Sequence, residues 1–212
     1  MYKAVIFDLD GVLADTAGLH FKAWRQLAQD LGIEFTEEDN IELKGLDRMS
    51  SLNKILEKTD AQYSDSEKLE FAERKNATYC KLIQDLSQED MLPGSVAVLE
   101  QAKTLGLKVG LASASKNALS LLKRFGVLDK FDYVADAAKV SRSKPDPEVF
   151  LVAASGVNVA PEHCIGVEDA VAGVAAIKSA NMYAIGVGDK DELKQADVVV
   201  SSTADIDLSA YL

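Results

Sequence analysis

The sequence predicts an α/β fold: a doubly wound, Rossmann-like parallel sheet with an inserted all-helical cap. Two observations support this prediction. Short apolar segments typical of buried strands alternate with amphipathic helical segments over most of the chain, and one long segment has helices but no convincing strand. A chain of 212 residues is long enough for one large domain with such an insertion, because domains commonly contain about 100–200 residues.

The apolar segments have the β-branched composition of strands that are covered on both faces. We expect strands at Ala4–Phe7, Lys108–Ala112, Tyr133–Ala135, Cys164–Val167, Tyr183–Val187 and Val198–Val200. Amphipathic segments between them predict helices near Ser95–Leu105, Ala118–Phe125, Pro147–Gly156 and Ala170–Ala180. Strands that alternate with helices are typical of a parallel sheet with right-handed crossovers.

The strandless segment follows the first strand and predicts a separate cap over residues 17–88. Its first helix places apolar and aromatic side chains at spacings of three and four, so that they share one face. These residues are His20, Trp24, Leu27, Ala28 and Leu31. Further helices are expected near Arg48–Lys58 and Ser66–Asp85. Pro93 and Gly94 mark the return to the core, which is predicted to comprise residues 1–16 and 89–212.

Composition limits the possible partners and location. The 34 acidic and 23 basic residues give a net charge of −11, which disfavours binding to nucleic acid or to an anionic membrane. The uncharged stretches are too short for a signal peptide or a membrane span. Cys80 and Cys164 fit no metal-binding or redox pattern and are expected to be reduced thiols. We therefore expect a cytoplasmic protein that acts on a small molecule. A monomer is our expectation for its oligomeric state, which the composition does not determine.

Two acidic pairs follow predicted strands. Asp8 and Asp10 come after the first strand, and Glu168 and Asp169 come after Cys164–Val167. Ligands of open α/β sheets bind beyond the carboxyl ends of the strands. Carboxylates that converge there repel by about 4 kcal/mol per pair at ~4 Å and an effective dielectric near 20, so the cluster requires a cation or shifted pKa values. Hard oxygen ligands favour Mg²⁺. The alternative is that each pair caps a turn or a helix.

Two further segments carry candidate phosphate ligands. Ser113 lies between a predicted strand and a helix, where backbone N–H groups and a hydroxyl group can bind phosphate. Lys144 lies in a loop beside Pro145. Each residue also has a simpler interpretation, a helix cap for Ser113 and a solvated surface charge for Lys144.

In chain order, these motifs resemble those of the haloacid dehalogenase superfamily. They are Asp8-Leu9-Asp10-Gly11, Ser113, Lys144-Pro145 and Gly166-Val167-Glu168-Asp169. The resemblance implies that Asp8 is a nucleophile that becomes phosphorylated and that Asp10 is the general acid and base. It also implies that Ser113 and Lys144 orient the phosphoryl group. The same resemblance assigns Mg²⁺ to Asp8, the Asp10 carbonyl, Glu168 and Asp169.

Three segments also resemble the β-phosphoglucomutase family: Asp15–His20, Glu42–Leu52 and Ala112–Ala118. This likeness implies that Arg48 holds the phosphate that is not transferred and that His20 links acid–base chemistry to cap closure. The substrate-binding residues it implies are Asp10, Thr16, His20, Lys44, Gly45, Leu46, Arg48, Ser51, Ser113, Ala114, Ser115, Lys116 and Asn117. Asp47 replaces a small hydroxyl residue beside the arginine, and we expect its charge to weaken the hold of Arg48 on phosphate.

The function predicted from this resemblance is the Mg²⁺-dependent interconversion of β-D-glucose 1-phosphate and β-D-glucose 6-phosphate through a bisphosphate. A sugar-phosphate phosphatase is the alternative within the same superfamily. A catalytically silent sugar-phosphate-binding regulator is a third possibility, which the four intact acids disfavour. A solvated cap surface is the simpler interpretation of Lys44 and Arg48.

Overall fold

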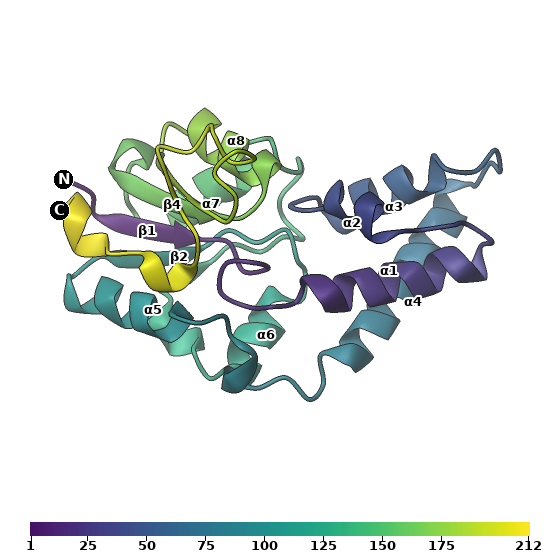
Figure 1. Ribbon diagram of the computed structural model, residues 1–212, viewed down its shortest axis with the longest axis horizontal. Coiled ribbons are helices and arrows are strands. Elements are labelled where there is room, and N and C mark those ends of the chain that lie inside the picture. The colour runs from purple at the N-terminus through teal and green to yellow at the C-terminus, as the bar shows by residue number, and fades with distance from the viewer.

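A six-stranded parallel sheet forms the centre of the larger lobe in the computed structural model, which describes residues 1–212 (Figure 1). The strand order is β3-β2-β1-β4-β5-β6. The strands are β1 (Ala4–Phe7), β2 (Lys108–Leu111), β3 (Tyr133–Val134), β4 (Cys164–Glu168), β5 (Tyr183–Val187) and β6 (Val198–Val200). The predicted fold class is confirmed, and each predicted strand matches an observed one.

The central position of β1 brings the acidic segments together. Phe7 pairs with Leu111 of β2 on one side and with Val167 of β4 on the other. Beyond the end of β1, the N–H of Asp8 donates to the carbonyl of Val167 over 3.0 Å. Because parallel strands end at the same edge of a sheet, this register places Asp8 beside Glu168.

Helices cover both faces of the sheet (Figure 1). Val5 and Phe7 belong to the apolar cluster beneath α5 (Ser95–Thr104) and α6 (Ala118–Arg124). Ala4 and Ile6 belong to the opposite cluster, beneath α7 (Glu148–Gly156) and α8 (Val171–Ser179). Side chains alternate between the faces of a strand, so β1 is buried on both sides. Short 3₁₀ helices lie at Gln88–Asp90, Leu128–Lys130, Pro161–His163, Thr203–Asp205 and Leu208–Tyr211.

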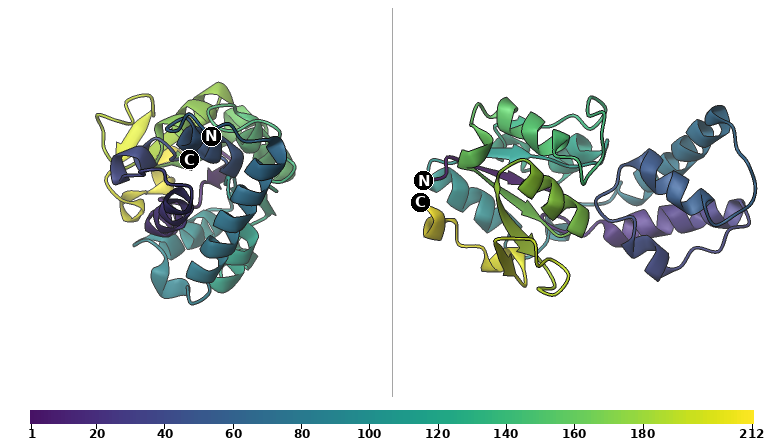
Figure 2. Two further views of the ribbon diagram at one scale, coloured as in Figure 1. Left: turned by 90° about the vertical axis from the view of Figure 1, so that its right-hand side faces the viewer. Right: turned by 90° about the horizontal axis from the view of Figure 1, so that it is seen from above.

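The remaining helices form a smaller lobe, the cap, at one end of the molecule (Figures 1 and 2). They are α1 (Ala17–Asp30), α2 (Glu37–Ile41), α3 (Arg48–Leu56) and α4 (Asp65–Leu82). This lobe has its own apolar core, which includes Trp24, Leu52, Ile55 and Phe71. The domain boundaries given above stay a prediction.

Helix α2 was not predicted from the sequence. It spans five residues and buries none of them, so it has no apolar stripe that would reveal it. A capping box forms it instead: Thr36 accepts from the N–H of Asp39, and Asp39 accepts from the N–H of Thr36. Its existence depends on this local exchange of hydrogen bonds rather than on packing.

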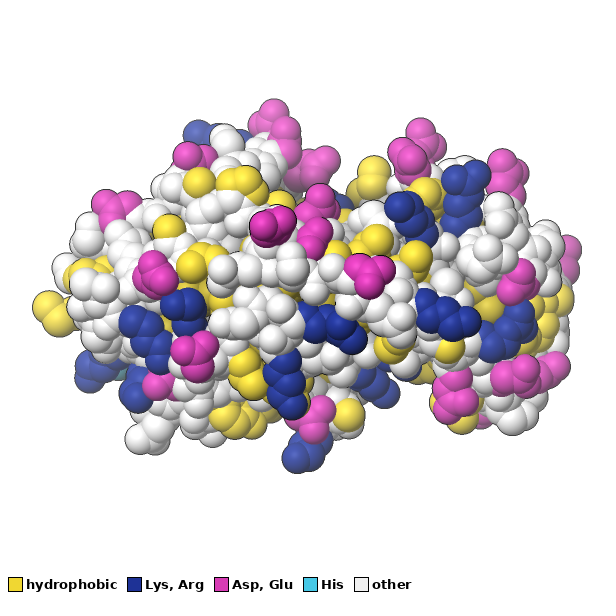
Figure 3. Space-filling model, turned by 90° about the horizontal axis from the view of Figure 1, so that it is seen from below, with side chains coloured by type: hydrophobic (Ala, Val, Ile, Leu, Met, Phe, Trp, Pro, Cys, Tyr) yellow, Lys and Arg dark blue, Asp and Glu magenta, His cyan; other side chains and the backbone are white.

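The surface carries charges of both signs, which are spread over both lobes on the face in Figure 3. None of the helices combines the length and the hydropathy required to cross a bilayer. Both chain termini lie together at the end of the larger lobe that is remote from the cap (Figures 1 and 2).

Gly94 provides a test of backbone fit at the return from cap to core. Its φ of +85° is left-handed, and a Cβ there would lie 2.2 Å from the Cα of Ala204. We expect Gly94→Ala to lower the free energy of unfolding by about 2–5 kcal/mol, because a left-handed alanine and an overpacked contact both cost energy. Urea denaturation measures this change.

Gly106→Ala is the matched control. Gly106 has a φ of +72°, but no atom lies within 4 Å of the position that a Cβ would take. This variant should lose only about 1–2 kcal/mol, the cost of the dihedral angle alone. Equal losses in the two variants would show that Ala204 moves aside and that the close approach is not a constraint.

Candidate active site

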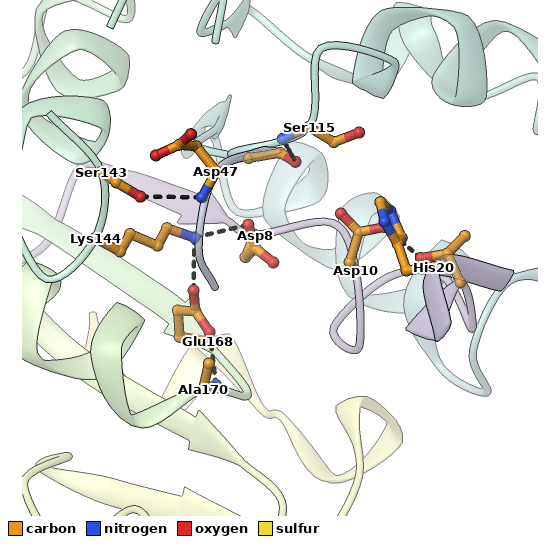
Figure 4. Close-up of polar contacts among 11 residues, drawn as sticks. Asp8, Asp10, His20, Asp47, Ser115, Ser143, Lys144, Glu168 and Ala170 are labelled. Carbon is orange, nitrogen blue, oxygen red and sulfur yellow. Dashed lines mark hydrogen bonds and ion pairs between the residues drawn. The ribbon is translucent and has the colours of Figure 1, made fainter. Parts of the chain in front are cut away.

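A buried lysine joins the two acidic segments at the carboxyl edge of the sheet (Figure 4). The Nζ of Lys144 lies 2.8 Å from Oδ1 of Asp8 and 2.6 Å from Oε1 of Glu168. The second carboxylate oxygen of Glu168 accepts from the N–H of Ala170 over 2.7 Å. Lys144 is therefore not a solvated surface charge: its position is fixed by two carboxylates from neighbouring strands.

Burial and charge act against each other among these groups. Burial raises the pKa of Asp8 well above its usual value, although the Lys144 ammonium acts in the opposite direction. Burial also disfavours the Lys144 ammonium, but the charges of Asp8 and Glu168 outweigh it and raise the pKa of Lys144. The two carboxylates therefore favour the charged form of Lys144 beside Asp8.

Three carboxylates form a cluster with the donor chemistry of a divalent cation site. Asp8, Glu168 and Asp169 each place one oxygen so that all three lie within 4.8 Å of one another. Burial, and then the charge of Glu168, raise the pKa of Asp169 to about 7. A Cβ at Gly11, whose φ is +82°, would lie 2.2 Å from Oδ2 of Asp169, so only glycine leaves room for this carboxylate. Hard oxygen donors without sulfur ligands fit a hard cation.

Asp10 points away from this cluster. Its carboxylate accepts a hydrogen bond from the Thr16 hydroxyl group and faces Nε2 of His20 at 3.6 Å. Burial opposes ionisation, but His20 and Thr16 outweigh it and lower the pKa of Asp10. Nδ1 of His20 in turn lies 2.9 Å from Nζ of Lys75 on the cap helix α4. Asp10, His20 and Lys75 therefore form a polar chain from the core to the cap.

Lys75 is a site residue that the sequence analysis missed. Its side chain is buried, and its Nζ lies 4.5 Å from the centre of the Trp24 ring. Burial, followed by repulsion from Arg48, lowers the pKa of Lys75 to about 7. The available signal was its position in α4, midway between Phe71 and Tyr79 on the apolar face of that helix.

The far end of the cavity contains neutral and cationic donors. Asn76 of α4 accepts two hydrogen bonds at Oδ1, one from Nη2 of Arg48 over 2.8 Å and one from Nδ2 of Asn117 over 2.9 Å. Arg48 makes no ion pair in the structure. Lys116 also lines this cavity. This end of the cavity is suited to an anion.

Most predicted site residues line this one cavity between the lobes. They are Asp8, Asp10, His20, Lys44, Gly45, Leu46, Arg48, Ser51, Ala114, Ser115, Lys116, Asn117, Lys144 and Asp169. The others lie behind the wall: Ser113 accepts from the N–H of Ser115, Thr16 binds Asp10, and Glu168 binds Lys144. The lining residues that were not predicted are Ala17, Trp24, Asn40, Leu43, Lys75 and Asn76.

Asp47 is a helix cap. Its carboxylate accepts from the N–H groups of Met49 and Ser50 over 2.7 and 3.1 Å, and from the Ser50 hydroxyl group over 2.6 Å. Its own N–H donates to Oγ of Ser143, the residue before Lys144, over 3.0 Å (Figure 4). The carboxylate thus stabilises the first turn of α3, from which Arg48 projects.

Fold and site together define a class of protein, and comparisons with known proteins agree. Residues 2–181 match the haloacid dehalogenase-like hydrolase family, and the chain belongs to this family. The superfamily predicted from the motifs is therefore confirmed.

Within that family, the chain is similar to β-phosphoglucomutases. It is 45% identical over 208 residues to the β-phosphoglucomutase of Bacillus subtilis. The aligned region covers 97% of this chain and 92% of that protein. A crystal structure of β-phosphoglucomutase from Clostridium difficile matches with a TM-score of 0.96 at 48% identity and covers 100% of this chain and 96% of that one. A phosphorylated carbohydrates phosphatase of Thermotoga maritima is 34% identical over 186 residues, 86% of this chain and 83% of that protein.

Lys75→Met tests the buried amine through the pH dependence of stability. Folded Lys75 releases its proton near its lowered pKa of about 7, whereas the unfolded chain keeps the proton to about pH 10.4. The unfolded state binds more protons between these values, so wild-type stability should rise with pH relative to the variant, by up to about 1.4 kcal/mol per pH unit above pH 7.

Urea denaturation of both proteins from pH 6 to pH 9 measures the difference. The exposed Lys81 of the same helix provides the control variant, Lys81→Met, whose stability difference from wild type should not change over this range. If the Lys75→Met difference is also constant with pH, Lys75 keeps its charge when the protein folds.

Proposed function

We propose that this protein is a Mg²⁺-dependent β-phosphoglucomutase that interconverts β-D-glucose 1-phosphate and β-D-glucose 6-phosphate through β-glucose 1,6-bisphosphate. One observation carries the proposal: a single cavity contains two separate sets of groups for binding phosphate. Lys144 and the acidic cluster form one set, and Arg48, Lys116 and Asn117 form the other. The similarity to two β-phosphoglucomutases supports the same assignment.

A bisphosphate explains both sets, because one phosphate can react while the other is held. A monophosphatase needs only the set at Lys144. The similarity to a carbohydrate phosphatase is weaker than that to the phosphomutases, at 34% against 45% identity. The cations at the far end of the cavity have no acidic partner, so the mutase explains a charge that the phosphatase leaves without a role.

The acidic cluster would hold Mg²⁺ through Asp8, Glu168 and Asp169, together with the main-chain carbonyl of Asp10. When bound, this ion supplies positive charge that offsets the repulsion between a carboxylate and a phosphate. Lys144 adds a second fixed positive charge beside Asp8.

In the first half-reaction, phosphorylated Asp8 donates its phosphoryl group to a hydroxyl group of the bound glucose phosphate. Asp10 removes the hydroxyl proton, the sugar oxygen bonds to phosphorus, and the bond between phosphorus and Asp8 breaks. The lowered pKa of Asp10 keeps it ionised and able to accept this proton. Lys144 stabilises the negative charge that returns to the Asp8 carboxylate.

In the second half-reaction, the bisphosphate turns around and presents its other phosphate. A carboxylate oxygen of Asp8 bonds to phosphorus while the bond between phosphorus and the sugar oxygen breaks. Asp10 returns its proton to that oxygen. Throughout, contacts of the cap with the core, such as that between Asp47 and Ser143, help to exclude water from the phosphorylated enzyme.

The net charge of −11 favours small sugar phosphates over nucleic acid or membranes as partners. The monomeric state and the cytoplasmic location given above stay predictions.

Asp8→Asn tests the nucleophile. The amide has almost the same shape but is a poor nucleophile, so mutase activity should fall at least ~100-fold while the fold is retained. Conversion of β-glucose 1-phosphate can be followed with glucose-6-phosphate dehydrogenase. The exposed Asp15 of the same loop gives the control variant, Asp15→Asn, which should stay active. Comparable loss in both variants would remove the special role of Asp8.

Arg48→Ala tests mutase against phosphatase. Bidentate hydrogen bonds to a phosphate contribute about 1.5–3 kcal/mol each, so mutase kcat/KM should fall roughly ten- to a hundredfold or more. Hydrolysis of phosphorylated Asp8 should change much less, because Asp10 and Lys144 remain in place. Free phosphate and glucose 6-phosphate are measured in parallel.

Arg25→Ala, at an exposed arginine of the same lobe outside this cavity, is the control. It should leave both activities near wild type. A parallel fall of mutase and hydrolysis in Arg48→Ala, or no change in either, would favour the phosphatase.

A further inference from the structure

The carboxamide of Asn76 lies where the two lobes meet. Asn76 belongs to α4 of the cap, and its Oδ1 accepts from Nη2 of Arg48 over 2.8 Å and from Nδ2 of Asn117 over 2.9 Å. Arg48 begins helix α3 of the cap, whereas Asn117 precedes helix α6 of the core. One oxygen atom therefore holds a donor from each lobe, and all three side chains line the cavity.

A guanidinium group has five N–H donors and no acceptor, so the single bond to Asn76 leaves Arg48 most of its donors. Asn117 is fixed from both sides: Nδ2 donates to Asn76, and Sγ of Cys80 lies 3.6 Å from Oδ1. The second N–H of the Asn117 amide has no partner in the protein. The shared acceptor thus orients two donors and leaves others free for a ligand.

The neutrality of this acceptor also matters. Arg48 is half-buried, so its positive charge is partly desolvated, and this burial lowers the pKa of Arg48. A carboxylate in place of the Asn76 amide would form an ion pair with Arg48 and would repel a phosphate. An amide oxygen orients the guanidinium group but does not cancel its charge.

We propose that Asn76 is a positioning residue for the second phosphate of the substrate: it holds Arg48 of the cap and Asn117 of the core toward one point and keeps that point positively charged. This inference rests on the proposed function, because it requires the phosphate that is not transferred to bind beside Arg48. Asn76 acts through these two donors and needs no contact with the reacting atoms.

Two substitutions separate positioning from a purely structural tie between the lobes. Asn76→Ala removes the acceptor, and the KM for β-glucose 1-phosphate should rise ~5–20-fold with kcat within about threefold, because the hydrogen bonds that orient Arg48 and Asn117 are lost. Asn76→Asp keeps the shape and strengthens the bond to Arg48. If Asn76 only tied the lobes together, the KM of Asn76→Asp would match that of wild type. If Asn76 is a positioning residue, Asn76→Asp should raise the KM more than Asn76→Ala does.

The matched control is Asn53→Ala, at an exposed asparagine of α3 whose side chain makes no hydrogen bond. All assays contain saturating β-glucose 1,6-bisphosphate. A second measurement is the rate at which acetyl phosphate, a donor with a single phosphate, phosphorylates Asp8 with release of acetate. That rate should be unchanged in the Asn76 variants, and it also shows that they are folded.

The outcomes separate the role of Asn76 from the proposed function. A raised KM in both Asn76 variants, larger for Asn76→Asp, with unchanged phosphorylation by acetyl phosphate supports the proposal. A wild-type KM in Asn76→Ala, or a KM in Asn76→Asp no higher than in Asn76→Ala, overturns it. If Arg48→Ala also leaves the mutase unaffected, the proposed function itself fails; if Arg48→Ala impairs the mutase and the Asn76 variants do not, only the role of Asn76 is wrong.

Discussion

The buried ammonium group of Lys144 is the interaction on which the site depends. It lies between Asp8, beyond β1, and Glu168, at the end of β4, and all three side chains are almost inaccessible to solvent. Loss of one partner from a buried ion pair typically costs about 3–5 kcal/mol, because the other charge is left uncompensated. The parallel register of β1 and β4 brings the two carboxylates together. The ion pairs of Lys144 therefore require that these two strands be neighbours in the sheet.

The cap joins the core through both apolar and polar contacts. Most of its apolar side chains form a cluster of their own, but Ala23 of α1 and Tyr79 of α4 belong to the cluster beneath α5 and α6. The contacts across the cavity are hydrogen bonds and ion pairs, such as Asp47 with Ser143 and Lys44 with Asp169. Partly exposed polar contacts of this kind contribute little net stability, so by themselves they attach the cap to the core only weakly.

The sheet and the acidic residues could be predicted because each leaves a local pattern: continuous apolar segments for strands such as β1, and paired acids at their ends. Helix α2 and the roles of Lys75 and Asn76 left no such pattern. A short, exposed helix has no apolar stripe, and Lys75 and Asn76 acquire their roles from partners in other elements, His20 and Arg48. Two local signals were present: an aspartate directly before a helix for the N-cap role of Asp47, and the position of Lys75 on the apolar face of α4.

The closeness of the two termini, at the end of the core farthest from the cap, has a consequence for topology. A short linker could join residues 1 and 212, and the chain could then be opened within the connection between α3 and α4. In such a circular permutant the sheet is encoded by one uninterrupted segment, and the cap helices become its two flanking arms. The insertion of the cap into the core sequence would then reflect only the order of the segments along the chain. The three-dimensional arrangement of the two lobes would not require it.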